Sequence, residues 1–395
     1  MKGLSKTRSA LPRSGIREIM DYSVNIPDVI HLEVGEPNVD TPLHIREAAY
    51  AAMNEGFTHY TPNAGLNTLR ESIVTHLQKQ YGLNSKVEEI VVTAGAVNAL
   101  SASVLSLVES GEEVLIPDPG WPNYEQIILS QESIPKRYKL NPELGFIPDT
   151  TELERVVTSK TKAIIINSPG NPTGGVLSEE NIKEVLAFAS KHDLYVISDE
   201  VYDGIIFEGK HICPLLYDTE GRVISIFGFS KNYAMTGWRV GYAVAPQHIA
   251  MTIAKVLEPL VSCASSVSQK AAEAAISCPQ DFVEEMRSIY KVRRDHVYKL
   301  FEEAGINAYK PKGAFYMMVD LSDVIPDEKN PAIILLQEAG VAVAPGATFG
   351  STTKKMIRIS FATEDSKLFE GVSRICNFVR QKRKNIVKGD SEHVS

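Results

Sequence analysis

Cysteine is scarce in this chain of 395 residues, which contains four cysteines and no Cys-x-x-Cys spacing. This scarcity argues against a structural zinc site and against a framework of disulfide bonds, and it fits a reducing cytosol. No apolar run approaches the eighteen or more residues that a membrane span needs. The basic start of the chain also lacks the apolar segment of a signal peptide. We therefore expect a cytoplasmic protein that holds no metal and does not insert into a membrane.

The chain has no strong excess of charge of one sign. Its 41 lysines and arginines against 49 acidic residues give a net charge of −8 at pH 7. A mildly acidic surface is poorly suited to nucleic acid or to an anionic membrane. The hydrophobic share of 44% and the charged share of 23% are those of a globular protein, which excludes a disordered chain. The sequence also lacks the P-loop, H-E-x-x-H and G-x-S-x-G motifs, so it does not support the chemistry that each carries.

Short β-rich runs alternate with helical patterns through the middle of the chain. Continuous apolar strands between helices are typical of a largely parallel sheet that is covered on both faces. We expect strands at 89–93, 113–116, 163–167, 194–198 and 223–227, with helices such as 98–108 and 179–190 between them.

From about residue 286 the pattern changes to a smaller α+β unit. We expect a helix at 286–303, strands at 314–320, 341–344 and 356–361, a helix at 331–338 and a final helix. The predicted organisation is a large α/β domain at 46–285 and a small domain made of 1–45 plus 286–380. The polar tail at 381–395 is predicted to be a solvated or disordered end.

A lysine follows the strand expected at 223–227, at the edge where open α/β sheets bind ligands. Lys231 lies in the stretch GFSKNYAMTGWRVG, in which Arg239 comes eight residues later. A single loop lysine is usually a surface residue, but this stretch is long and specific. It resembles the lysine signature of the class I and II aminotransferases, enzymes of pyridoxal phosphate (PLP). The resemblance extends from about residue 14 to about residue 377, and it is greatest to the bacterial branch that includes many aspartate aminotransferases.

The resemblance implies the fold-type I architecture, in which a large α/β domain with a mostly parallel sheet carries PLP beside a smaller α+β domain. Lysine is the residue type that condenses with the aldehyde of PLP. The cofactor also needs a carboxylate that keeps its ring nitrogen protonated. Asp199, in SDEVYDG after the strand expected at 194–198, matches that role, although an acidic residue at a strand end is often a helix cap. Tyr202 matches the family tyrosine at the ring hydroxyl oxygen.

The same resemblance implies further cofactor contacts. Asn171, in the Asn-Pro-Thr-Gly turn, is directed at the ring hydroxyl oxygen, and Trp121 stacks on the ring. Small residues at a helix start leave N–H groups free for an anion, and arginine can add a bidentate contact. The implied phosphate site comprises the amides of Gly95, Ala96 and Val97, the side chain of Arg239, and Tyr60 of a neighbouring subunit. The protein is therefore expected to be a homodimer with shared active sites.

Arg358 is the candidate for binding the substrate. In the pattern MIRISF, Arg358 and Ser360 share one face of a strand, opposite three apolar residues. Such an arginine either faces solvent or binds an α-carboxylate, which suits its geometry better than that of lysine. The resemblance places the carboxylate contact here. The implied substrate-binding residues are Gly35, Trp121, Asn171 and Arg358, and Ile16 and the stretch near Cys263 are expected to line the side-chain pocket.

Two positions depart from the family pattern. Relatives that are selective for acidic substrates often carry a lysine at the position of Val97, and others use an arginine of the partner subunit. Because valine supplies no cation, we expect a neutral, hydrophobic or aromatic amino donor in preference to aspartate, although Val97 also continues an apolar helical stripe. Gly228 stands where many relatives have a serine bound to the phosphate, which predicts one hydrogen bond fewer.

These features together predict an aminotransferase that moves an amino group from an L-amino acid to a 2-oxo acid by a ping-pong mechanism. Lys231 and Asp199 are the predicted catalytic residues. One alternative is a PLP-dependent lyase on the same fold, acting for example at a C–S bond, against which the Gly-Asn-Pro-Thr-Gly turn argues modestly. A second is a non-catalytic PLP-binding sensor, for whose DNA-binding domain there is no room before Gly35. A third is a binding protein with a vestigial site, which the intact set of motifs disfavours.

Overall fold

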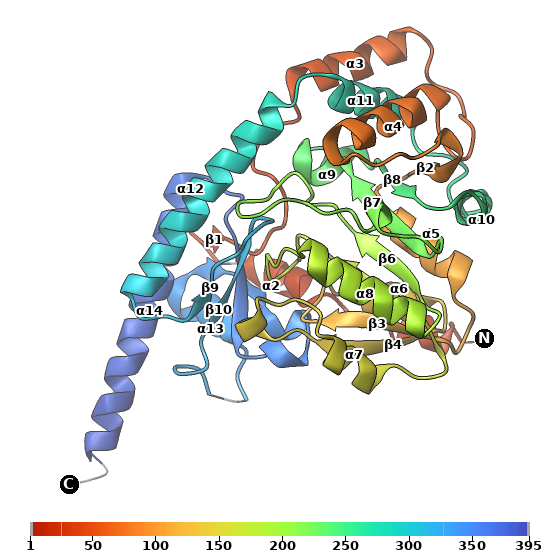
Figure 1. Cartoon of the computed structure of the whole chain (residues 1–395). Coiled ribbons are helices and arrows are strands. Elements are labelled where there is room, and N and C mark those ends of the chain that lie inside the picture. Colours follow the sequence, from red (N-terminus) through yellow and green to blue (C-terminus); the bar gives the residue numbers. More distant parts are fainter. Residues whose placement is uncertain (1–2, 25, 327, 393–395) are drawn as a thin grey trace.

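The computed structural model describes residues 3–24, 26–326 and 328–392. Its larger sheet has the strand order β2-β8-β7-β6-β5-β3-β4 in the described part of the chain (Figure 1). Strand β8 runs antiparallel to both of its neighbours, and the remaining pairs are parallel. The bounds are β2 Ile90–Thr93, β3 Glu113–Asp118, β4 Ile134–Lys139, β5 Thr161–Asn167, β6 Tyr195–Asp199, β7 Val223–Gly228 and β8 Gly241–Val244. The predicted parallel sheet is confirmed.

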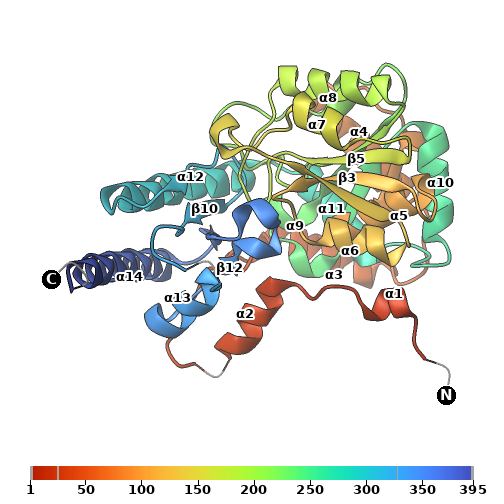
Figure 2. The ribbon, with the colours of Figure 1, turned by 90° about the horizontal axis from the view of Figure 1, so that it is seen from below.

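Helices cover both faces of this sheet, because its strands carry apolar residues on both sides. The side chain of Ile165 packs with α5, α6 and α10, whereas those of Ile164 and Ile166 pack with α7 and α8. Figure 2 shows β3 and β5 between these two layers. The helices are α5 Ala96–Leu107, α6 Asn123–Ser130, α7 Thr150–Val156, α8 Glu179–Lys191 and α10 Gln247–Leu257, and α3 Leu43–Asn54, α4 Asn67–Tyr81 and α11 Ser266–Ser277 pack around β2 and β8.

A smaller antiparallel sheet has the order β12-β13-β10-β9, and β1 pairs with β11 beside it. The bounds are β1 Ile30–His31, β9 Ala308–Tyr309, β10 Tyr316–Asp320, β11 Val341–Ala342, β12 Ala344–Pro345 and β13 Met356–Ser360. The single strand predicted at 341–344 is wrong, because β11 pairs with β1 whereas β12 pairs with β13. The strand predicted at 314–320 begins at Tyr316, since Ala314 has a φ of 57°, which is incompatible with extended backbone.

Helices α2 Gly15–Ser23, α12 Asp281–Glu303, α13 Pro331–Ala339 and α14 Asp365–Glu392 accompany this sheet. Helix α12 begins five residues before the predicted residue 286, with Asp281 and Glu284 in its first turn, where the helix dipole favours acidic residues. The tail from residue 381 was predicted to be a solvated or disordered end; its described part is ordered as helix, because α14 continues to Glu392, and residues 393–395 lie outside the described residues. Its run of lysine, arginine and glutamine residues consists of good helix formers. The division into two domains stays a prediction.

Parallel pairing brings the carboxyl ends of β5, β6 and β7 to one edge of the larger sheet. Asn167 lies opposite Asp199, and Asp199 lies opposite Ile226, which is two residues before the end of β7. A predicted site residue lies at or just after each of these ends: Asn171 after β5, Asp199 at the end of β6 and Lys231 after β7. In the described residues, no helix is long and apolar enough to cross a bilayer.

Candidate active site

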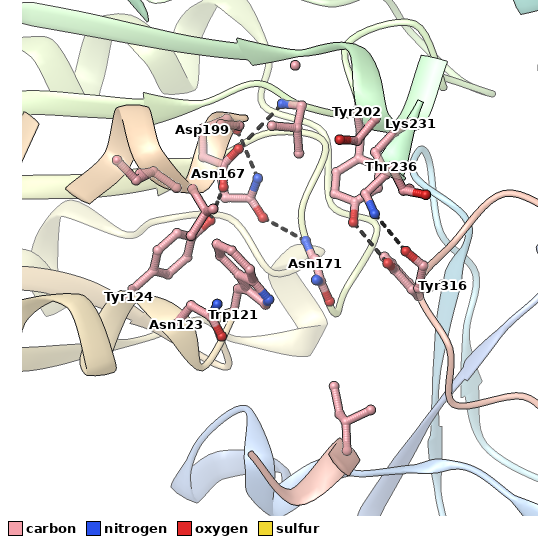
Figure 3. Close-up of a pocket in the computed structure, with 18 of the residues that line it drawn as sticks. Trp121, Asn123, Tyr124, Asn167, Asn171, Asp199, Tyr202, Lys231, Thr236 and Tyr316 are labelled. Carbon is pink, nitrogen blue, oxygen red and sulfur yellow. Dashed lines mark hydrogen bonds between the residues drawn. The ribbon is translucent and has the colours of Figure 1, made fainter. Parts of the chain in front are cut away.

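A cavity of about 400 Å³ lies at this edge of the larger sheet, and residues of the smaller sheet and of α2 complete its lining. Figure 3 shows Tyr124 and Asp199 on one side of it, and Tyr202, Lys231 and Tyr316 on the other. The structure therefore gathers residues from distant parts of the chain. The predicted residues that line the cavity are Ile16, Gly35, Ala96, Val97, Trp121, Asn171, Asp199, Tyr202, Gly228, Lys231, Arg239 and Arg358.

Lys231 reaches the cavity from the short helix α9, Phe229–Asn232, directly after β7. Its Nζ donates a hydrogen bond of 2.6 Å to the carbonyl oxygen of Gly35. Burial lowers the pKa of this amine to about 8, although the nearby carboxylate of Glu36 acts in the opposite direction. A Cβ on residue 35 would lie 2.3 Å from the hydroxyl oxygen of Tyr316, so only glycine lets the backbone at residue 35 lie this close to Tyr316. The lowered pKa gives Lys231 a larger neutral, nucleophilic fraction near neutral pH than an exposed lysine has.

Asp199 is the last residue of β6 and is buried, with 3% of its surface exposed. Its Oδ2 accepts a hydrogen bond of 2.6 Å from the hydroxyl of Tyr124, and its backbone oxygen accepts one of 2.9 Å from the side chain of Asn167. Burial raises the pKa of Asp199 to about 6, while the Tyr124 hydrogen bond and the charge of Lys231 act to lower it. A buried carboxylate without a cation in contact is suited to a positively charged partner.

Arg358, on β13, is 2% exposed, so the alternative of a solvent-facing arginine is wrong. Its guanidinium lies between two aromatic rings, 4.1 Å from the centre of Tyr316 and 4.9 Å from that of Phe349. It donates hydrogen bonds to Oδ1 of Asn171 at 2.9 Å and to the backbone oxygen of Glu33 at 2.6 Å. Its Nε is buried without a partner. Since buried N–H groups are normally paired, this donor is available to a carboxylate.

The amino end of α5 offers a site for an anion. Gly95 is the N-cap residue, and a Cβ on it would lie 2.6 Å from a terminal nitrogen of Arg239. Glycine therefore lets the guanidinium lie against the start of the helix, where free N–H groups and the dipole favour negative charge. Ala96, Gly228 and Ser230 line the cavity beside it. This arrangement suits a phosphate group.

Three of the predicted positions are not among the residues that line the cavity of their own chain, namely Gly95, which directly precedes the lining residue Ala96, Tyr60 and Cys263. Tyr60 is 89% exposed and does not line the cavity. The thiol of Cys263 accepts a hydrogen bond of 3.4 Å from the backbone N–H of Thr61, and Cys263 does not line the cavity of this chain, so the expectation that the stretch near it lines the side-chain pocket stays a prediction. The hypothesis that Tyr60 reaches a neighbouring subunit stays a prediction.

The structure adds lining residues to which sequence reasoning assigned no role. Tyr124 lies three residues after Trp121 in the stretch PGWPNY, but only the fold shows that it reaches Asp199. Tyr316 comes from the smaller sheet and donates or accepts a 2.9 Å hydrogen bond with the hydroxyl of Tyr202. No sequence signal pointed to Tyr316. The other added lining residues are Glu33, Leu100, Asn123, Asn167, Val201, Ser230 and Thr236.

The donor set fits PLP. A buried carboxylate, an amine of lowered pKa and an anion site at a helix start lie around one cavity, as a charged pyridine ring, an aldehyde and a phosphate require. Because residue 95 is glycine, the guanidinium of Arg239 fits against the start of α5, an arrangement that suits a phosphate. Among the residues that the structure describes, no group of three His, Cys, Asp or Glu side chains could hold a metal ion.

Comparison with known proteins gives the same assignment. Residues 27–375 match the family model "Aminotransferase class I and II". An aspartate aminotransferase of Pyrococcus horikoshii is 38% identical over 92% of this chain and 94% of its own length, and an aromatic-amino-acid aminotransferase of Thermococcus litoralis is 36% identical over 94% and 96%. The solved aspartate aminotransferase of Thermus thermophilus with maleate is 34% identical and superposes with a TM-score of 0.91 over 95% of this chain and all of its own. The chain therefore belongs to the class I and II aminotransferases, the fold-type I enzymes that use pyridoxal 5'-phosphate.

Proposed function

We propose that this aminotransferase takes its amino group from a neutral, hydrophobic or aromatic L-amino acid in preference to aspartate, and passes it to a 2-oxo acid by a ping-pong mechanism. The observation that carries the proposal is the composition of the cavity lining. Among the described residues, the cations that line it are Lys231, Arg239 and Arg358. Each has a role in holding the cofactor or the α-carboxylate, so none remains for a second carboxylate on the substrate.

The wall where a distal carboxylate would need a cation is apolar. Val97 and Leu100 lie one turn apart on α5 and line the cavity, and Ile16 of α2 lines it as well. An apolar side chain gains about 25 cal/mol for each Å² that it buries against such a wall, whereas an unpaired carboxylate loses its hydration there. The related proteins carry names that specify aspartate and names that specify aromatic amino acids, so the lining is the better guide.

We assign the cofactor contacts as follows. Asp199 faces the ring nitrogen, where its buried charge keeps that nitrogen protonated. Tyr202 and Asn171 direct their side chains at the ring hydroxyl oxygen, and Trp121 stacks on the ring. The start of α5 and Arg239 hold the phosphate. Neighbours support two of these residues: the hydroxyl of Tyr316 bonds that of Tyr202, and the backbone N–H of Asn171 donates a 2.7 Å hydrogen bond to Oδ1 of Asn167.

When bound, PLP supplies an aldehyde that condenses with amines and a ring that takes up the electrons released at the substrate α-carbon. The residues of the chain do the rest. Arg358 binds the α-carboxylate through a bidentate contact and so orients the α-hydrogen toward Lys231. The Lys231 amine, whose pKa of about 8 lies near working pH, removes a proton from the α-carbon and later returns one.

The proposed assembly is a homodimer in which Tyr60 of each subunit reaches the phosphate site of the other. Its support is the exposure of this large aromatic side chain, because a tyrosine that is 89% exposed in one chain has its apolar ring available to a partner. Helix α3, which precedes Tyr60 in the chain, carries further exposed apolar side chains, namely Leu43, Tyr50 and Met53.

Absorbance spectroscopy of the purified holoenzyme during addition of single L-amino acids tests the proposed donor class. We expect aromatic or aliphatic donors to discharge the cofactor band with a kcat/KM at least roughly tenfold above that of aspartate. Aspartate as the fastest donor would refute the proposed preference. Release of ammonia and a 2-oxo acid without an added oxo-acid acceptor would instead indicate a lyase.

A further inference from the structure

We propose that Asp118 is a positioning residue for the binding of the substrate α-carboxylate. Asp118 ends β3 in the larger sheet and anchors residues 346–353, which we call the 346–353 loop. This loop presents Phe349 to Arg358. The inference rests on the proposed function, because that function assigns the α-carboxylate to Arg358.

The anchor consists of four hydrogen bonds to one buried carboxylate. Asp118 is 2% exposed. Its Oδ1 accepts hydrogen bonds from the backbone N–H of Thr352 at 3.2 Å and from the hydroxyl of that residue at 2.7 Å. Its Oδ2 accepts the corresponding pair from Ser351, at 3.1 Å and 2.8 Å. A buried charge that receives four donors fixes the position of the segment that supplies them.

The backbone of the 346–353 loop approaches the Asp118 carboxylate at the end of β3 very closely. A Cβ on Gly350 would lie 1.9 Å from Oδ1 of Asp118, so the backbone reaches the carboxylate only because residue 350 is glycine. The preceding residue, Phe349, is also hydrogen-bonded to the larger sheet and its loops. The backbone oxygen of Phe349 accepts hydrogen bonds from the N–H of Gly120 at 2.8 Å and from Nη1 of Arg137 at 3.0 Å.

Through Phe349, the anchored loop packs against the guanidinium of Arg358. The ring of Phe349 lies 4.9 Å from it, and the ring of Tyr316 lies 4.1 Å away. Stacking between two aromatic rings holds the plane of an arginine side chain, which decides whether its N–H groups meet a carboxylate in line. The loop also ends just before β13 begins at Met356, two residues before Arg358. Loosening Asp118 therefore disturbs the arginine without removing any group that touches PLP.

The test compares two carbonyl reagents that react with the cofactor of the holoenzyme. Aminooxyacetate carries a carboxylate, and O-methylhydroxylamine does not. In Asp118→Asn the side chain keeps its size. An NH₂ group replaces one of the two oxygens, so it faces the N–H and O–H donors that this oxygen had accepted, and their two hydrogen bonds are lost. We expect the rate constant with aminooxyacetate to fall about tenfold, as the loss of hydrogen bonds to a charged group predicts, and that with O-methylhydroxylamine to stay within about twofold. Equal effects on both reagents, or none, would overturn the inference.

Two further variants keep the test decisive. If Asp118→Asn does not fold, Ser351→Ala combined with Thr352→Val removes two of the four donors and is expected to slow aminooxyacetate selectively by about threefold, with exposed Ser288→Ala as the neutral control. Arg358→Lys is measured alongside. If Arg358→Lys is selective and the anchor variants are not, this inference alone fails. If Arg358→Lys shows no selectivity, the proposed carboxylate site is wrong, and the inference falls with it.

Discussion

The Nζ of Lys231 donates a 2.6 Å hydrogen bond to the carbonyl oxygen of Gly35, a residue 196 positions earlier in the chain. The side chain of Thr236 is also bonded to that of Glu36. The loop that carries Gly35 is therefore linked twice to the segment that carries the catalytic lysine. A substrate that binds beside Gly35 meets the amine directly, and this proximity is the basis of the predictions about Lys231.

Removing the amine separates cofactor binding from catalysis. In Lys231→Ala we expect PLP to bind without a covalent link and turnover to be abolished, because no other group is placed to move the α-proton. Absorbance spectra before and after dialysis report the binding, and a coupled transamination assay reports the turnover. Retained transamination by this variant would sink the assignment of Lys231.

The pH dependence of PLP capture reports the pKa of Lys231. Only the neutral amine attacks the aldehyde, and burial lowers this pKa to about 8. We expect the rate at which cofactor-free protein takes up PLP to rise with pH and to level off above about pH 8. A small-molecule lysine analogue, whose pKa is about 10.4, should keep rising for another two pH units. A protein rate that still increases tenfold per unit above pH 9 would contradict the lowered pKa.

Asp199→Asn should lower activity and raise the stability of the cofactor-free protein. Loss of the buried charge removes the partner of the ring nitrogen, so we expect kcat to fall by about 10²–10³-fold. The pKa of Asp199 is raised by burial from 3.8 to about 6, so its contribution to stability is present below pH 4 and is lost as the pH rises through 6. At pH 8 the variant should therefore be more stable by roughly 3 kcal/mol.

Urea unfolding at two pH values measures this effect. The difference between Asp199→Asn and the natural protein should be largest at pH 8 and should become small at pH 4, where the carboxyl group is protonated in the folded protein and about half protonated in the unfolded protein. An equal difference at the two pH values would show that burial of the charge is not its cause.

A cation at position 97 should change the preferred donor. Val97 is the second residue of α5 and lines the cavity. In Val97→Lys we expect the ratio of kcat/KM for aspartate to that for phenylalanine to rise roughly tenfold, since one charge-assisted contact is gained. The lysine at a helix start should also reduce stability by about 0.3–1 kcal/mol. Val97→Met, which adds length without charge, is the matched control and should leave the ratio nearly unchanged.

Mixed dimers test the shared active site. Tyr60→Ala and Lys231→Ala should each have low activity alone. In a hybrid of the two, one site combines the intact Lys231 of the Tyr60→Ala chain with the intact Tyr60 of the Lys231→Ala chain. We expect mixing after mild denaturation to restore activity toward the value of one site per dimer. No recovery, despite hybrids that sediment as dimers, would mean that Tyr60 acts within its own chain or not at all.

The sequence could predict the strands and the residues that follow them, because apolar runs and specific motifs are local features. Lys231, Asp199 and Asn171 each sit at the end of such a run, and parallel pairing then brings them together. Strands β1, β4, β8 and β9 were missed: Ile134–Lys139 is mostly polar and only half buried, and the other three strands have only two to four residues each. Tyr124 and Tyr316 could not be assigned roles, because their partners are 75 and 114 residues away and are set by packing alone.

The antiparallel strand β8 determines how far apart Lys231 and Arg239 lie in the sequence. Because β8 lies directly beside β7, Lys231 and Arg239 both belong to one connection of twelve residues, 229–240, which places an amine and a guanidinium at the same end of the sheet. The spacing between these two cations is therefore a local property of about ten residues. Insertions and deletions elsewhere in the chain can reshape the pocket without changing the distance from the reactive nitrogen to the phosphate clamp.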